Sequence, residues 1–199
     1  DFARYWLHRW LHKVPILWSF HKVHHTATVL NPFTVFRTHP VEAVLFSMRS
    51  ALVQGLATAI FFFFLGNQVT LMMVLGASIF TFTFNLLGSN LRHSPVSIRY
   101  WKPLECILMS PAQHHIHHST AKEHIDKNFG VALSVWDWIF GSLSLSKAEE
   151  HLSFGLNGEQ SRDQHSLKGL YLAPFHQAWG VFLRFFSRLP FSIYPKHSA

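Results

Sequence analysis

A length of 199 residues indicates one domain, and 49% hydrophobic against 14% charged residues is typical of a membrane protein rather than a soluble one. The net charge of +7 comes without a dense basic run, so it favours the cytoplasmic face of a membrane over nucleic acid as a partner. The single cysteine, Cys106, excludes an internal disulfide and any zinc site built from several cysteines.

Residues 1–25 are predicted to be helical. Aromatic side chains recur there at three- and four-residue spacing with basic residues between them, which is the pattern of an amphipathic helix. Pro15 is disfavoured inside a helix and therefore divides this stretch into two helices. Trp6, Trp10 and Trp18, beside these basic residues, suit a membrane–water interface.

A long uncharged stretch predicts a membrane hairpin. Residues 50–91 include no charged side chain, and this run is long enough for two spans, since one span needs about 20 residues. A turn at 65–68 separates two transmembrane helices, which we predict at Val44–Phe64 and Val69–Leu87. The alternative, a buried hairpin in a soluble protein, is disfavoured by the length of the run and by the consecutive phenylalanines at 61–64.

A hairpin enters and leaves on one side of the membrane, so the segments before and after it share that side. Both segments are rich in basic residues and the turn has none, which places them in the cytoplasm by the positive-inside rule. The basic residues are Arg4, Arg9, Lys13, Lys22, Arg37 and Arg49 before the turn and Arg92, Arg99 and Lys102 after it.

Beyond the hairpin the chain alternates between apolar and polar stretches. A short helix is predicted at Leu104–Met109, and a second apolar stretch lies at Val131–Leu143. Residues 146–166 are polar and are predicted to form a loop. Leu167–Phe186 is aromatic and amphipathic, so we predict a helix that lies on the membrane surface.

Histidine is unusually frequent, with 16 among 199 residues, and eight of these histidines form three motifs. A His-x-x-x-His pair is followed by two copies of His-x-x-His-His, one on each side of the hairpin. Residues three and four apart lie on one side of a helix, so each motif offers a set of nitrogen donors to a metal ion. One zinc or iron ion takes four to six ligands, so eight donors predict two ions. The predicted ligands are His8, His12, His21, His24, His25, His114, His117 and His118, and His93, just after the second span, is a candidate ninth.

Imidazole suits iron, zinc, copper and nickel alike, so the ligand type does not choose the metal. His115 points away from the ligand side of its helix, and His39 and His124 stay undecided between ligand and structural roles. The remaining histidines belong to no motif and are predicted to be polar surface residues: His151, His165, His176 and His197.

The three motifs, arranged around a membrane hairpin, resemble those of the fatty acid hydroxylase/sterol desaturase superfamily. The residues at 18–25, 110–114, 126–130 and 136–141 agree with that family as well. The later segments are similar to bacterial members and to the alkylglycerol monooxygenase branch.

The resemblance covers residues 1–145, which are expected to form the membrane domain. The chain does not begin with methionine and family members carry further spans before the first motif, so upstream spans are expected. Residues 146–199 are expected to form a C-terminal loop and an interfacial amphipathic helix. Many members have a histidine pair between the hairpin and the last motif, where this chain offers His93.

The resemblance implies a non-haem di-iron oxygenase. Such an enzyme is an O2-dependent membrane oxidoreductase, of the monooxygenase type, that hydroxylates or desaturates a C–H bond of a lipid. A sterol, a fatty acyl chain, an ether lipid and a carotenoid all remain open as substrates. The implied cofactors are two iron ions, which zinc can replace on purification, with O2 as co-substrate. The chain has no Gly-rich nucleotide loop, so electrons are expected from an external donor of the cytochrome b5, ferredoxin or reductase type, and no nucleic acid partner is expected.

Side chains around the ligands are expected to orient the imidazoles. Within this implied outer shell we place His115, and Asn128 as a residue that would hold a metal-bound water. Carboxylates are the usual partners of ligand histidines, and for Asp137 a structural role is the slightly favoured alternative. The candidate carboxylates are Asp126, Asp137, Glu105 and Glu123.

Two other functions compete with the enzyme. The first is a non-catalytic membrane protein that binds or handles zinc, and the second is a bis-histidine haem protein. Zinc transport and haem binding would both place the ligands within the spans, and the predicted spans contain no histidine. The expected fold is therefore all-α: an integral membrane helical protein with a transmembrane hairpin and a cytoplasmic-side helical cap that carries the dimetal site. The expected location is multi-pass, in a bacterial inner membrane or in the endoplasmic reticulum.

Overall fold

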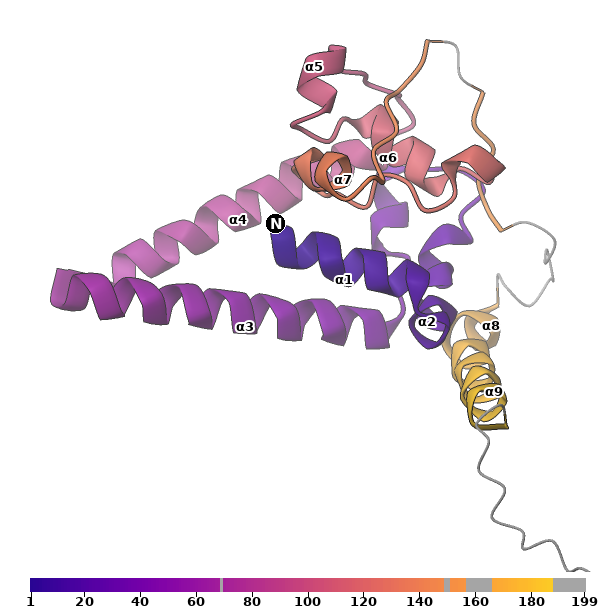
Figure 1. Cartoon of the computed structure of the whole chain (residues 1–199), viewed down its shortest axis with the longest axis horizontal. Helices are drawn as coiled ribbons and strands as arrows, with labels where there is room; N and C mark the ends of the chain where they lie inside the picture. Colours follow the sequence, from indigo (N-terminus) through magenta and orange to yellow (C-terminus); the bar gives the residue numbers. More distant parts are fainter. Residues whose placement is uncertain (69, 149–150, 157–165, 188–199) are drawn as a thin grey trace, which may run out of the picture.

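The computed structural model describes residues 1–68, 70–148, 151–156 and 166–187. This described part is helical and contains two isolated β-bridges but no strand, which confirms the all-α prediction for it. Two long helices extend as an arm from a compact body, and a third helix projects from the body on another side (Figure 1). Most of the buried apolar side chains lie in the body, as do the buried histidines.

The first two helices of the body are α1 (Phe2–Lys13) and α2 (Pro15–His25). Val14 between them has an extended backbone, and Pro15 occupies the first turn of α2, where its missing N–H costs nothing. The predicted break at Pro15 is therefore confirmed. The two helices pack against each other and are followed by the 3-10 helix η1 (Pro32–Phe36).

The arm consists of α3 (Pro40–Leu65) and α4 (Leu71–Arg92), joined through η2 (Gly66–Gln68). Gly66 ends α3 with φ +54°, a left-handed conformation that favours glycine. The helical hairpin is present, and each helix extends beyond its predicted bounds toward the body. Among the described residues, α3 is the one helix long and apolar enough to cross a membrane, and its apolar window is not buried in the fold.

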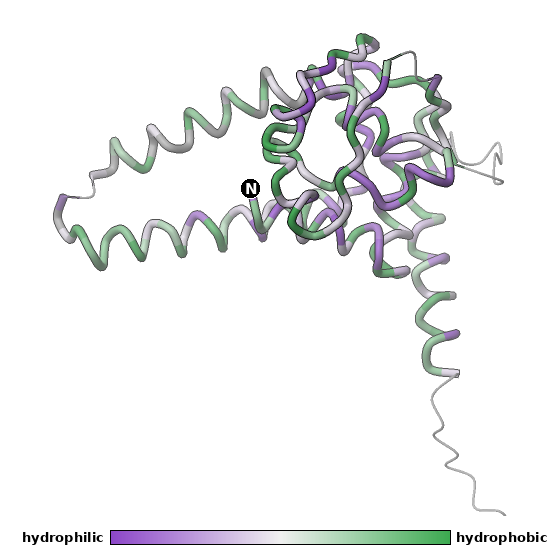
Figure 2. The backbone as a smooth tube through the Cα atoms, turned by 45° about the horizontal axis from the view of Figure 1, so that its top comes forward, coloured by the Kyte–Doolittle hydropathy of each residue, from purple (hydrophilic) through white to green (hydrophobic). Residues whose placement is uncertain are grey.

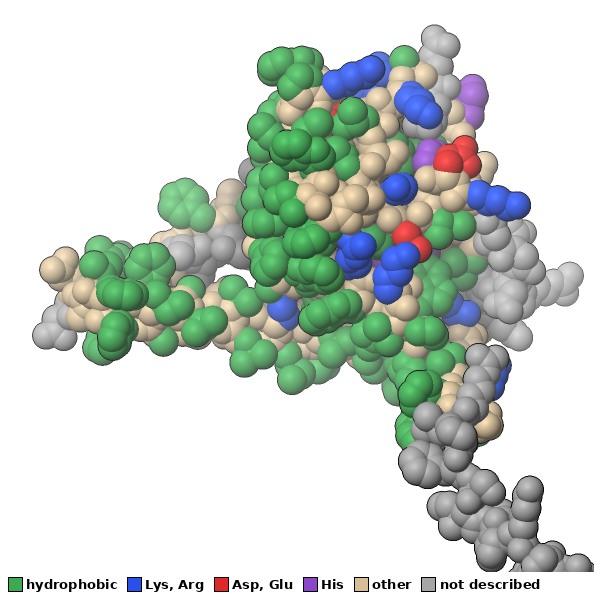
Figure 3. All heavy atoms as spheres, viewed as in Figure 1, with side chains coloured by type: hydrophobic (Ala, Val, Ile, Leu, Met, Phe, Trp, Pro, Cys, Tyr) green, Lys and Arg blue, Asp and Glu red, His purple; other side chains and the backbone are tan. Residues whose placement is uncertain are grey.

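Apolar residues dominate the arm, as the hydropathy colours in Figure 2 show. Hydrophobic side chains also cover the side of the body next to the arm, whereas most visible Lys and Arg side chains lie away from the arm (Figure 3). On this face the body thus has an apolar side next to the arm, and its Lys and Arg side chains are scattered over the rest.

After the arm the chain forms α5 (Lys102–Glu105), α6 (Pro111–His118), η3 (Lys122–His124) and α7 (Val135–Ile139). The predicted helix Leu104–Met109 is wrong, because α5 ends at Glu105 and Leu108 bridges to Leu133 instead. Two residue contacts explain the ending: the buried carboxylate of Glu105 accepts hydrogen bonds from the hydroxyl groups of Ser110 and Ser146, which draws the chain out of the helix.

The C-terminal amphipathic helix is split into α8 (Leu167–Tyr171) and α9 (Ala173–Ser187). A single helix at Leu167–Phe186 was predicted, and the break at Leu172 has a local cause, since Pro174 has no N–H to continue the ladder. α9 packs against α2, where the rings of Phe20 and Phe175 meet edge to face.

Candidate metal centre

The histidine-rich helix α6 begins with strong local signals. Ser110 caps its N-terminus, and Gln113 completes a capping box, while Pro111 occupies the first turn. Gln113 also donates to the carbonyl of Glu105, which ties α6 to α5. Every residue of α6 is buried, so its histidines face the interior of the body rather than solvent.

The fold gathers nine histidines into two groups, each with ligand nitrogens within 4.8 Å of one another. Each group combines histidines that precede the arm with histidines that follow it. The five-histidine group is His8, His12, His21, His25 and His117, and the four-histidine group is His24, His93, His114 and His118. All eight motif histidines are therefore brought together, and His93 joins them.

The three histidines of one His-x-x-His-His motif do not stay together. In α2, His21 and His25 enter one group and His24 enters the other. Residues four apart differ by about 40° around a helix, whereas adjacent residues differ by about 100°. The expectation that each motif presents one set of donors is thus corrected, because the pairs four apart stay together while the histidine between them points to the second group.

Backbone carbonyls hold the outer nitrogens of three histidine rings. The Nδ1 atom of His8 lies 2.7 Å from the carbonyl oxygen of Phe129. The Nδ1 atom of His117 lies 2.9 Å from the carbonyl oxygen of Lys127, and that of His24 lies 3.3 Å from the carbonyl oxygen of Arg37. A carbonyl oxygen only accepts, so each Nδ1 carries the proton and each Nε2 keeps its lone pair. This tautomer leaves Nε2 available to a metal ion.

The inner nitrogens lie unusually close together. Nε2 of His21 is 3.0 Å from Nε2 of His12, and in the four-histidine group Nε2 of His114 is 3.0 Å from Nε2 of His93. Two lone pairs at this distance repel unless a proton or a metal ion lies between them. Two nitrogens about 2.1 Å from one metal ion and at right angles to each other are about 3.0 Å apart, so the spacing fits a shared ion.

Buried nitrogen atoms without a partner support the same interpretation. Nε2 of His25 and Nε2 of His117 are buried and have no hydrogen-bond partner among the described residues. Leaving such an atom unsatisfied costs about 1–3 kcal/mol, which coordination would recover. The donor set of buried neutral imidazoles therefore fits a metal ion in each group.

Burial also sets the protonation state of these rings. Desolvation is the largest cause that lowers the pKa of His24 to about 4 and the pKa of His117 to about 3. Desolvation, followed by the charge of His24, lowers the pKa of His93 to about 2. Protonated imidazole cannot bind a metal ion, so these shifts keep the candidate ligands in the neutral form that can bind one at neutral pH.

One residue beside the candidate ligands was missed by the sequence analysis. Glu42, in the first turn of α3, is 2% exposed, and its Oε1 lies 3.0 Å from Nδ1 of His21. A carboxylate on the outer nitrogen of a ligand histidine orients the ring and makes it a stronger donor. The sequence could have pointed to this residue, because Glu42 is the only acidic residue between Asp1 and Glu105.

We expect the substitution Glu42→Gln to weaken metal binding about 10- to 100-fold, because glutamine keeps the shape of the side chain but removes the charge beside His21. Metal content after dialysis against a graded series of chelator concentrations measures the effect. The matched control is Glu123→Gln, since Glu123 is exposed in η3. Equal metal retention by both variants would show that the carboxylate does not support the site.

Asp137 acts on the histidines through the backbone. Its fully buried carboxylate accepts from the N–H groups of Phe129 and Gly130 and from the hydroxyl of Ser142. The carbonyl of the same Phe129 accepts the Nδ1 proton of His8, so Asp137 fixes a contact of the site without touching it. A Cβ at Gly130 would meet the Asp137 Oδ2 at 2.7 Å, which explains the glycine there.

Asn128 and Asp126, which were expected to surround the ligands, form hydrogen bonds and an ion pair with other parts of the fold. The amide nitrogen of Asn128 donates to the carbonyls of Gln113 and Ser144, and its oxygen accepts from the Ser144 N–H. Asp126 lies at the half-exposed rim and forms an ion pair of 2.5 Å with Lys13. Both residues have a left-handed backbone, with φ of +56° and +61°, which turns the chain so that the Lys127 carbonyl reaches His117.

The remaining candidates lie outside both groups. The ring of His115 contacts that of Phe154, and the ring of His39 caps α3 and contacts the Tyr171 carbonyl. His124 contacts the hydroxyl of Ser119. His151 and His176 are exposed as predicted, whereas the predictions for His165 and His197 fall outside the described residues.

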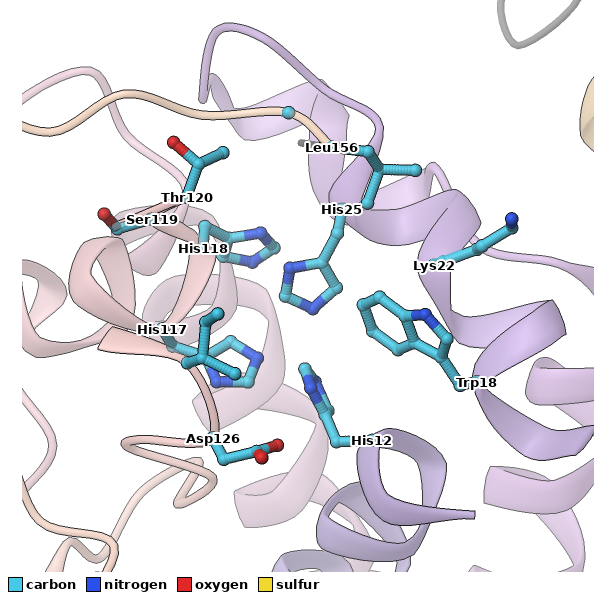
Figure 4. Close-up of a pocket in the computed structure, with 12 residues that line it drawn as sticks. His12, Trp18, Lys22, His25, His117, His118, Ser119, Thr120, Asp126 and Leu156 are labelled. Carbon is cyan, nitrogen blue, oxygen red and sulfur yellow. The ribbon is translucent and has the colours of Figure 1, made fainter. Parts of the chain in front are cut away.

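A cavity of about 300 Å³ adjoins the histidines. Figure 4 shows His12, His25, His117 and His118 turned toward this space, with Trp18 on one side. Three of these histidines belong to the five-histidine group and His118 to the other. The cavity therefore gives a small molecule access to both groups.

Comparison with known proteins places the chain in a protein family. The profile of the fatty acid hydroxylase family matches residues 1–142. Alkylglycerol monooxygenase of Homo sapiens is 32% identical over 156 residues, which are 78% of this chain and 31% of that protein. Ornithine lipid hydroxylase OlsE of Rhizobium tropici is 27% identical over 162 residues, which are 81% of this chain and 44% of that protein. No solved structure matches. The chain thus spans less than half the length of these relatives.

Proposed function

The chain belongs to the fatty acid hydroxylase family, and from this membership we propose that it is an O2-dependent oxidoreductase that hydroxylates or desaturates a C–H bond of a lipid. The observation that carries the proposal is the pair of buried histidine groups with inward Nε2 atoms. The five-histidine group and the four-histidine group would each hold one iron ion. Bound iron would supply, with dioxygen, the oxidant that an unactivated C–H bond requires.

The residues of this chain have three tasks in the proposed reaction. The nine imidazoles hold the metal ions, and the carbonyls of Phe129, Lys127 and Arg37 keep three of the outer nitrogens protonated. Burial excludes water, which would otherwise compete with the lipid for the oxidant. Trp18 and the cavity beside it would limit the size of molecules that reach the metal ions.

A membrane location is part of the proposal. The apolar and unburied α3 supports one span, and we propose that α4 forms a second, so that the protein is multi-pass. The body would then lie at the cytoplasmic surface, and the lipid would enter sideways from the bilayer. Residues 1–145 would form the membrane domain, and residues 146–199 would add a C-terminal loop and an interfacial helix. An external one-electron donor would reduce the site.

The printed names of the relatives favour chain lipids over sterols. An alkylglycerol and an ornithine lipid both carry long chains on a polar head, and both names stand for monooxygenation or hydroxylation. We therefore propose hydroxylation of an ether or acyl lipid as the first reaction to test. The alternative of a non-catalytic zinc protein is not favoured, because the named relatives are enzymes.

The decisive experiment compares the lipids of cells with and without the protein, under air and under nitrogen. A lipid that gains an oxygen atom, or loses two hydrogen atoms, only with protein and air is the expected result. Cells that produce His117→Ala provide the control, because this change removes a proposed ligand. If the same lipid change persists with His117→Ala, the histidine groups are not the site of oxidation.

A further inference from the structure

A second pocket lies apart from the histidines, between α1 and α3. It has a volume of about 480 Å³ and shares no residue with the two histidine groups. α1 contacts α3 near the end of the arm that joins the body (Figure 1). The pocket is lined by Arg4, Phe46, Ser47, Arg49, Ser50, Ala51 and Gln54. The oxidation proposed above uses none of these side chains.

Two guanidinium groups give this pocket a positive charge. Desolvation, and then the charge of Arg49, lowers the pKa of Arg4 to about 10, which indicates that the two cations are close enough to repel. The guanidinium of Arg4 also lies 5.7 Å from the centre of the Phe46 ring. The described residues that line the pocket include no aspartate or glutamate. An anion placed there would relieve the repulsion.

The polar groups of the pocket suit an anion with several oxygen atoms. Arg49 donates to the Ser50 hydroxyl at 2.6 Å, and its Nε is buried with no hydrogen-bond partner among the described residues. A guanidinium offers a planar fork of donors that matches phosphate and carboxylate oxygens. Ser47 and Gln54 line the same pocket and add a hydroxyl and an amide.

The position of the pocket favours a lipid over a soluble anion. Arg49 lies nine residues after Pro40, which is about 14 Å along the helix axis. Beyond Gln54 the helix carries exposed apolar side chains such as Leu56, Ile60 and Phe63. A lipid with its head at the arginines can therefore lay its chain along α3.

We propose that this pocket binds the anionic head group of a membrane lipid, a phosphate or a carboxylate, through Arg4 and Arg49. Arg4 lies one turn before His8 in α1, so the head would sit about 6 Å along the helix axis from a histidine of the five-histidine group. The inference depends on the proposed membrane location of α3 and not on metal chemistry.

The test measures which lipids stay with the purified protein. The protein is placed in nanodiscs of phosphatidylcholine with a minor share of phosphatidylglycerol, extracted, and examined by native mass spectrometry. The wild type should retain phosphatidylglycerol in preference to phosphatidylcholine. Arg49→Gln should reduce this preference on the order of tenfold, since it removes a charged donor. Arg99→Gln is the matched control, because Arg99 is exposed between α4 and α5 and lines no part of the pocket.

Several results would overturn the inference. If the wild type retains the two lipids equally, the inference is wrong. It is also wrong if Arg49→Gln keeps the preference of the wild type for phosphatidylglycerol. Displacement of the lipid by an equal concentration of soluble glycerol phosphate would show that the pocket selects free phosphate. A protein that does not enter nanodiscs would overturn this inference together with the membrane location. His117→Ala should keep the lipid preference, so failure of the proposed oxidation leaves this result standing.

Discussion

Replacement of His117 by alanine is expected to remove the metal ion of the five-histidine group and to abolish lipid oxidation. The Nε2 of His117 is buried without a hydrogen-bond partner among the described residues, and the Lys127 carbonyl holds its Nδ1 in place. The ring is therefore oriented for one task, and alanine cannot replace it. Loss of an outer partner alone costs about 10- to 100-fold in affinity, so loss of a ligand should exceed that range.

Metal analysis and product formation measure this effect together. We expect about two iron ions per chain in the wild type and about one in His117→Ala, because two ions of four to six ligands each account for the nine histidines. His114→Ala should instead deplete the four-histidine group. His176→Ala serves as the control, since His176 is exposed on α9 and should retain full metal content and activity. Full metal content in His117→Ala would rule out this residue as a ligand.

The metal-free protein is expected to lose stability sharply when the pH falls below 6.5. Burial lowers the pKa of His24 to about 4 and the pKa of His117 to about 3, whereas an unfolded histidine titrates near 6.5. Between these values the unfolded chain binds more protons than the folded one, so the free energy of unfolding rises with pH. The contribution of these histidines to the free energy of unfolding is fully present above pH 6.5. It declines as the pH drops toward the pKa values of the folded state.

The size of this effect follows from the number of histidines. Each contributes about 1.4 kcal/mol per pH unit in this window, so His24, His93 and His117 together contribute about 4 kcal/mol. A typical domain has about 5–15 kcal/mol in total, so one unit of pH matters. Chemical unfolding of the metal-free protein at pH 7.0 and at pH 5.5, followed by circular dichroism, measures the difference. Bound metal should reduce it, because metal excludes the protons. Equal stability at both pH values would show that the histidines are not buried in the neutral form.

Much of the fold was predictable because its signals are local. Pro15 separates α1 from α2 through its own covalent structure, and Ser110 with Pro111 starts α6 in the same way. The arm followed from an uncharged run, which needs no partner to be recognised. The helix predicted at Leu104–Met109 failed for the opposite reason, since a buried glutamate with distant partners ends it.

The spacing of the histidines predicted which of them are candidate ligands, but it did not predict how they divide between the two groups. His-x-x-His-His indicates a helix face rich in nitrogen donors, and eight donors indicate two ions whatever the fold. Which histidine serves which group depends on how α2 and α6 face each other across the body. No local sequence pattern encodes that orientation. The division of each motif between two groups is therefore seen only in the tertiary structure.

The contacts around the ligands depend on folding even more strongly. Glu42 lies 21 positions from His21 and reaches it only because α3 starts beside α2. His93 joins the four-histidine group because the arm returns the chain to the body. Local sequence therefore defines the helices, the uncharged arm and the kind of donor, since each depends on neighbouring residues. The two histidine groups and the carboxylate beside His21 arise from contacts between segments far apart in the chain, which tertiary packing alone creates.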